Sequence, residues 1–177
     1  MKLILFHISY LILVLIPHCG LSQYANCPAI PEKYAWVEKE EYVQDREQII
    51  RTLRWLCTSP PGWQLKQRSL ANAYVLEWLA GTPEFSLVVQ SDLVPSLDKF
   101  PDLLNSMMHG MALYKLEHPD VNDSVKLHTE GLVVIAELAI QSKELSSDRE
   151  IRKIIKAHKR HKLKAYVKAR LSNSTGK

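Results

Sequence analysis

Short breaks that contain proline or glycine divide the middle of this chain into segments of helix length, and they constrain its fold more than any other feature. The first break covers residues 58–62, with Pro60 and Pro61, and the second covers residues 81–83. Proline lacks a backbone N–H and disfavours helical geometry in the residue before it, so helices end at both breaks. The sequence therefore predicts separate helices joined by short connections.

Between and beyond these breaks, apolar residues recur with the period of an α-helix. They predict five main helices at about residues 38–57, 64–80, 100–117, 124–144 and 149–171. Asp123 or Ser124 is expected to cap the fourth helix, and Ser147 or Asp148 the fifth. Short connections favour antiparallel neighbours, so the expected fold is all-α, a single compact domain of about five antiparallel helices.

Two segments within this pattern carry further information about the fold. Residues 64–80 leave no polar face, which is typical of a helix buried on several sides, so we expect this helix at the centre of the domain. Residues 85–90 fit either a short strand or an extended connector. An α+β fold with residues 87–89 as an edge strand is therefore the alternative to the all-α fold.

The first 22 residues have the pattern of a secretory signal peptide. Lys2 supplies a positive charge, residues 3–16 are almost wholly apolar, and Gly20 and Ser22 place small residues at the −3 and −1 positions of a cleavage before Gln23. An uncleaved membrane or lipid anchor and a structural segment are the alternatives. The apolar run is shorter than the roughly 20 residues of a membrane-spanning helix, which favours cleavage.

This cleavage defines the mature chain and its remaining cysteines. We expect a secreted or periplasmic protein in which residues 1–22 are removed, residues 23–171 form the helical domain, residues 172–177 form a disordered tail, and no segment spans a membrane. Only Cys27 and Cys57 would remain. Outside a reducing cytosol these two cysteines can form a disulfide, and two free, partly buried thiols are the alternative.

Charge is distributed unevenly along the chain. Residues 149–170 contain ten basic residues and one acid, a net charge of +9, whereas residues 23–148 contain eleven basic and eighteen acidic residues, a net charge of −7. The last predicted helix has an apolar stripe, from Ile151 through Lys162 to Ala169, and a cationic back. The stripe is expected to pack on the domain.

The cationic back is either solvated or binds an anionic surface such as lipid headgroups. The candidate residues for this contact are Arg152, Lys153, Lys156, Lys159, Arg160 and Lys164. Glu137 and Glu144 share a face of the preceding helix and are expected to approach some of these basic residues. Nucleic acid is a disfavoured partner, because an exported protein meets little of it and Tyr166 is alone as a stacking group.

Glu77 is the most unusual residue by position, because it lies among apolar residues of the second predicted helix. Burial raises the pKa of a carboxyl group, and such groups gather at functional sites. A structural ion pair with an arginine such as Arg51, Arg54 or Arg68 is the alternative. Asn72, in the same helix, either satisfies backbone groups at a helix crossing or binds a ligand.

His109 and His128 are the histidines that a hydrolase would need beside Glu77, and they complete the set of pocket candidates with Asn72. No G-x-S-x-G motif and no glycine-rich phosphate loop occurs in the sequence. His158 and His161 have an i, i+3 spacing, but the sequence supplies no further ligands, so we expect no metal and no cofactor. Asn122 and Asn173 begin glycosylation sequons, which matter only in a host that uses them.

The sequence therefore favours an exported, non-enzymatic helical domain that binds an unidentified macromolecule or an anionic surface of the cell envelope. Its support is the uneven charge and the lack of a convergent polar cluster. A small exported hydrolase that uses Glu77 with His109 or His128 is the alternative, and it requires that these residues meet in space.

Overall fold

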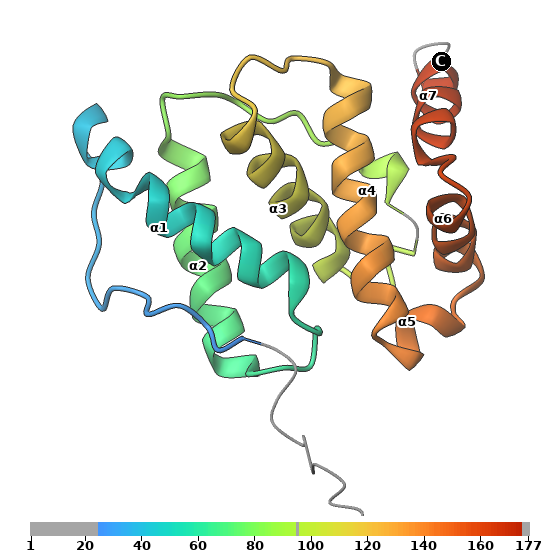
Figure 1. Cartoon of the computed structure of the whole chain (residues 1–177), viewed down its shortest axis with the longest axis horizontal. Coiled ribbons are helices and arrows are strands. Elements are labelled where there is room, and N and C mark those ends of the chain that lie inside the picture. Colours follow the sequence, from blue (N-terminus) through green and yellow to red (C-terminus); the bar gives the residue numbers. More distant parts are fainter. Residues whose placement is uncertain (1–24, 95, 175–177) are drawn as a thin grey trace, which may run out of the picture.

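The computed structural model describes residues 25–94 and 96–174, and these fold into seven α-helices and one turn of 3-10 helix (Figure 1). The helices are α1 (Lys39–Thr58), α2 (Leu65–Gly81), η1 (Ser91–Leu93), α3 (Asp102–Glu117), α4 (Ser124–Ile140), α5 (Lys143–Ser147), α6 (Arg149–Lys159) and α7 (Leu163–Ser174). The described residues contain no strand, so the all-α prediction is confirmed and residues 85–90 are an extended connector. The predicted signal peptide lies outside the described residues.

Helix α4 occupies the centre of the domain, where it contacts α1, α3, α5, α6 and α7. The prediction of a central α2 was wrong, since α2 packs mainly against α1 and lies at one edge (Figure 1). Tyr74 and Trp78 of α2 are fully buried, but Leu70 is half-exposed and Ala73 is exposed. The solvent side of α2 carries apolar and small residues, so hydrophobic periodicity could not reveal it.

Helices α3 and α4 cross at two glycines, Gly110 and Gly131. A Cβ atom on Gly131 would stand 2.8 Å from the backbone oxygen of Met107, and a Cβ atom on Gly110 would stand 3.0 Å from the Cα atom of Gly131. These distances are shorter than side-chain contacts in proteins, so the two backbones touch only because neither position carries a side chain.

The predicted fifth helix is broken into α6 and α7. His161 adopts a left-handed conformation, with φ at 55°. The N–H of His161 donates to the carbonyl of His158 at 2.9 Å, and the N–H of Lys162 donates to that of Ala157 at 2.8 Å. This is the Schellman pattern that ends helices, here built without the usual glycine, so no residue type in the sequence indicates the break.

The break changes which residues of the C-terminal segment are buried. Ile151 and Ile154 are buried as predicted, but beyond the break Leu163 and Val167 pack into the core. Lys162 of the predicted stripe, which would have continued the α6 face, is exposed. The turn therefore rotates the buried face of α7 relative to an unbroken helix.

Local capping chemistry sets several helix starts. Asp123 accepts a hydrogen bond from the N–H of Lys126 and caps α4. Asp148 accepts from the N–H groups of Glu150 and Ile151 and caps α6, so both predicted caps are confirmed. None of the helices that the structure describes combines the length and apolar character of a membrane span.

Candidate functional site

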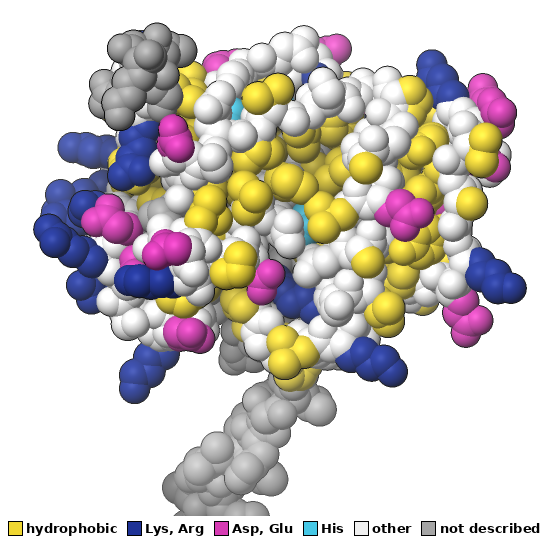
Figure 2. Space-filling model, turned by 180° about the vertical axis from the view of Figure 1, so that it is seen from behind, with side chains coloured by type: hydrophobic (Ala, Val, Ile, Leu, Met, Phe, Trp, Pro, Cys, Tyr) yellow, Lys and Arg dark blue, Asp and Glu magenta, His cyan; other side chains and the backbone are white. Residues whose placement is uncertain are grey.

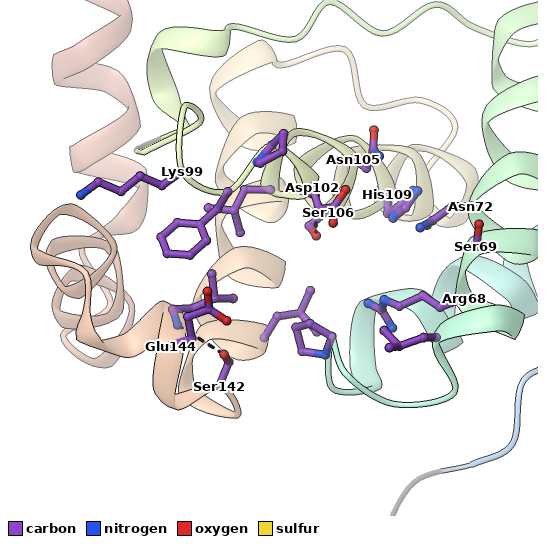
Figure 3. A pocket seen from close by; sticks show the side chains of 17 residues that line it. Arg68, Ser69, Asn72, Lys99, Asp102, Asn105, Ser106, His109, Ser142 and Glu144 are labelled. Carbon is purple, nitrogen blue, oxygen red and sulfur yellow. Dashed lines mark hydrogen bonds between the residues drawn. The ribbon is translucent and has the colours of Figure 1, made fainter.

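A pocket of about 580 Å³ opens between α2, the start of α3 and the connection from α4 to α5 (Figure 3). Its lining is mixed, and both the α2–α3 side and the α4–α5 side contribute polar and apolar side chains. The polar residues of the lining include Arg68, Asn72, Lys99, Asp102, His109 and Glu144. Asn72 and His109, two of the four residues predicted for a pocket, therefore lie in the same one.

His109 is the most deeply buried polar residue of this pocket, with 3% of its surface exposed. Burial lowers the pKa of the imidazole to about 3, and the nearby positive charge of Arg68 acts in the same direction. His109 is thus neutral at physiological pH. Its Nε2 atom is buried and has no hydrogen-bond partner among the described residues.

Arg68 is held rigidly at the same end of the pocket. Its guanidinium donates to the backbone oxygen of Leu56 at 2.8 Å and to that of Ser59 at 3.2 Å, and it lies 5.7 Å from the ring centre of Trp55. Burial lowers the pKa of Arg68, and the negative charge of Asp102 partly opposes that effect. No ion pair to Arg68 occurs within the described part of the chain.

Asn72 follows Arg68 by four residues on α2, so the two side chains share one helix face. Figure 3 shows both on the α2 side of the pocket, with His109 of α3 beside them. The Oδ1 atom of Asn72 is buried without a partner in the described structure. The prediction that Asn72 satisfies backbone groups therefore finds no support at this oxygen. Arg68 is one of the arginines expected to pair with Glu77, but the structure places it in the pocket with Asn72, and its i, i+4 spacing to Asn72 is the feature of the sequence that indicates this shared position.

Glu77 lies outside this pocket, on the exposed side of α2. The expectation that it is buried was wrong, because Leu70 and Ala73, two of the apolar neighbours that suggested burial, are themselves exposed. Burial raises the pKa of Tyr34, as does the adjacent Glu77 carboxylate, which accepts a hydrogen bond from Tyr34. Arg54, one suggested partner, pairs instead with Glu117 at 2.8 Å.

His128 lines a separate pocket of about 330 Å³ beside the connector of residues 85–90. Its Nε2 atom accepts from the N–H of Gln90 at 3.2 Å, which leaves Nδ1 as the donor to the carbonyl of Ser124 at 2.7 Å. Both ring nitrogens are thus used to fasten the connector to α4. The structure therefore keeps Glu77, His109 and His128 apart, and the grouping required for the hydrolase does not form.

Cys27 and Cys57, the two cysteines among the described residues, are free thiols. Cys27 is half-buried, and Cys57 is packed against Val134 and Leu138. Burial raises the pKa of Cys57 to about 12, so this thiol is protonated at neutral pH. Within the described ranges, no group of three or more His, Cys, Asp or Glu side chains is placed to hold a metal ion.

Exposed basic side chains gather along the edge that α6 and α7 form, as Figure 2 shows. We call this surface the basic edge and define it by Arg152, Lys153, Lys156, Lys159, Arg160 and Lys164, all of them exposed. Lys153 pairs with Glu150 at 2.7 Å. Lys156, Lys159, Arg160 and Lys164 have no ion pair with the described acids.

Glu137 and Glu144 were predicted to pair with basic residues of this edge, and the described residues show no ion pair between them. Glu137 instead meets His158, whose Nε2 atom lies 2.7 Å from Glu137 Oε1. Arg152 turns back along its own helix and donates to the carbonyl of Ser147 at 3.1 Å. The basic edge is therefore not neutralised by the preceding helix.

In comparisons with protein families, characterised proteins and solved structures, the chain has no significant match.

Proposed function

We propose that this chain is an exported, non-enzymatic helical domain that attaches to an anionic surface of the cell envelope through the basic edge. The observation that carries the proposal is the set of four exposed cations that lack ion pairs with described acids: Lys156, Lys159, Arg160 and Lys164. Unpaired surface cations attract anionic headgroups, and each contributes about 1 kcal/mol near such a membrane.

Export is part of this proposal, and its support is the charged, apolar and small-residue pattern of residues 1–22. The envelope would supply the anionic lipid. The separation of Glu77 from His109 and His128 gives the alternative hydrolase no assembled acid–base pair. A binding role asks only for surface charge, which the basic edge provides.

Sedimentation with lipid vesicles tests the proposal. The wild-type chain from Gln23 is expected to bind vesicles rich in phosphatidylglycerol, to ignore pure phosphatidylcholine, and to dissociate as salt rises. The triple variant Lys156→Gln, Lys159→Gln, Lys164→Gln should lose about 3 kcal/mol of binding free energy, roughly a 100-fold weakening.

A matched variant separates the basic edge from net charge. Lys33→Gln, Lys39→Gln, Lys66→Gln removes the same charge from exposed positions elsewhere. Retention of binding by this variant would support a localised contact. Equal weakening by both triples, or no binding of the wild type, would overturn the proposal.

A further inference from the structure

Helix α2 packs mainly against α1 and leaves its outer face open to solvent. The exposed residues of this face include Lys66, Leu70, Ala73 and Glu77, which follow one another at spacings of four, three and four residues. Such spacing keeps side chains on one side of an α-helix. Seen from behind, the domain shows hydrophobic side chains at the surface over α2 (Figure 2). The face therefore has an apolar middle, where Leu70 is 53% exposed, between two charged ends.

The two charges at the ends of this face have no counter-charge. Neither Lys66 nor Glu77 forms an ion pair within the described part of the chain. Glu77 accepts a hydrogen bond from Tyr34, which leaves other acceptor positions of the carboxylate open. The two residues are eleven positions apart, about 16 Å along a helix, so they cannot pair with each other within one chain.

A second copy of the same face is complementary to the first. When two α2 helices lie antiparallel, Lys66 of one copy lies opposite Glu77 of the other. In the same register Leu70 lies opposite the small side chain of Ala73, because both pairs are centred between residues 71 and 72. The alanine leaves room for the leucine, which allows the close approach that helix packing requires. A parallel arrangement would instead place like charges together, which is unfavourable.

From this pattern we infer that the outer face of α2 is a homodimer interface, in which two copies pair their α2 helices antiparallel about a two-fold axis. The axis repeats each contact twice and leaves no open face for a third copy, so assembly stops at the dimer. The contact is about 25 Å long, the length of one helix, which places it among the smaller protein interfaces and makes dimerisation weak and dependent on concentration.

This interface is separate from the basic edge. Helix α2 lies at one edge of the domain, and α6 and α7 lie at the opposite edge (Figure 1). The dimer therefore leaves the basic edge of each copy uncovered. Vesicle binding and dimerisation can consequently succeed or fail independently of each other.

Sedimentation equilibrium of the chain from Gln23, at concentrations from about 10 µM to about 1 mM, tests the inference. We expect a reversible monomer–dimer equilibrium, with the dimer fraction rising with concentration and falling with added salt. A monomer at every concentration would overturn the inference. Growth beyond the dimer would overturn it as well, because a two-fold contact closes.

Charge reversal tests the antiparallel register. Lys66→Glu and Glu77→Lys, made separately, each oppose like charges at both symmetric contacts and should weaken self-association about tenfold or more. An equimolar mixture of these two variants should form a heterodimer, because each contact then joins opposite charges. The double variant Lys66→Glu, Glu77→Lys should dimerise within about threefold of the wild type. Single variants that dimerise as well as the wild type, or a mixture that stays monomeric, would overturn the inference.

A polar substitution tests the apolar middle of the face. Leu70→Gln should weaken dimerisation about tenfold, because the leucine is buried twice in each dimer. Val43→Gln is the matched control, since Val43 is 51% exposed on α1 and lies outside the proposed contact. Both side chains are exposed in the monomer, so the melting temperature of the dilute protein should hold in both variants. Dimerisation that is unchanged by Leu70→Gln, or weakened equally by Val43→Gln, would overturn the inference.

Discussion

Helix α3 faces two very different neighbours through adjacent residues. At Gly110 its backbone touches α4, and an added Cβ would have no room beside Gly131. At His109, the residue before, it borders a pocket, and beside this pocket His109 Nε2 and Asn72 Oδ1 are buried without hydrogen-bond partners among the described residues. One side of α3 is closed and fully packed, and the other is open and incompletely bonded.

The two sides of α3 therefore contribute differently to the stability of the domain. The α3–α4 contact has no space for a ligand, and its glycines allow the central helix α4 to approach closely. The α2–α3 side keeps two buried polar atoms that have no hydrogen-bond partner among the described residues, and such atoms cost stability. Mutations on the two sides should therefore behave in opposite ways.

The largest effect is expected on the closed side. Gly131→Ala places a Cβ atom 2.8 Å from the backbone oxygen of Met107, so α3 and α4 must separate. Overpacking of this kind outweighs the gain in helix propensity, and the free energy of unfolding should fall by roughly 3 kcal/mol. Urea unfolding followed by circular dichroism measures it.

Gly62→Ala is the matched control for this substitution. A Cβ atom at Gly62 would meet nothing within 4 Å, and its stability should change by less than about 0.5 kcal/mol. If Gly131→Ala proved as stable as Gly62→Ala, the close contact between α3 and α4 would be wrong.

A smaller effect is expected on the open side, and it depends on pH. The pKa of His109 is about 3 in the folded protein, against an ordinary value of 6.5. The unfolded chain therefore binds more protons between these values, so the contribution of His109 is complete above pH 6.5 and is lost as the pH falls toward 3. Between pH 7 and pH 5 the free energy of unfolding should fall by about 2 kcal/mol from this residue.

The variant His109→Gln should remove this pH dependence, whereas His128→Gln should lower stability at both pH values because Gln90 and Ser124 lose their bonds. Hydrogen bonds from the N–H groups of the α6 start lower the pKa of Asp148 to about 2, so its own contribution is lost only at lower pH. A pH response that persists undiminished in His109→Gln would contradict the assignment.

Features of the fold that depend on local sequence could be predicted, and features that depend on distant contacts could not. The proline breaks and the caps Asp123 and Asp148 were predicted correctly because their effects are local. The turn at His161 was missed because a left-handed residue other than glycine leaves no pattern. The exposure of Glu77 was missed because its position depends on how α2 meets α1.

The candidate site likewise has features that could be predicted from the sequence and features that could not. Asn72 and His109 were recognisable as polar residues in helical segments, and they do share a pocket. Whether a buried nitrogen or oxygen has a partner depends on residues far apart in the chain, so the difference between His109 and His128 could not be read from sequence. The position of Arg68 could not be predicted for the same reason, because its hydrogen bonds to backbone oxygens at the end of α1 fix it beside the pocket.

The smallest effect is expected on the outer side of α4, away from both regions of α3. There Glu137 and His158 form a pair, but Glu137 is exposed. Exposed pairs contribute about 0–1 kcal/mol and are screened by salt, so Glu137→Gln should lower the free energy of unfolding by less than about 1 kcal/mol. High salt should likewise leave the melting temperature of the wild type nearly unchanged. A loss from Glu137→Gln as large as that from Gly131→Ala would mean that charge, rather than the glycine contact and the buried Ile151 and Ile154, holds α4 to its neighbours.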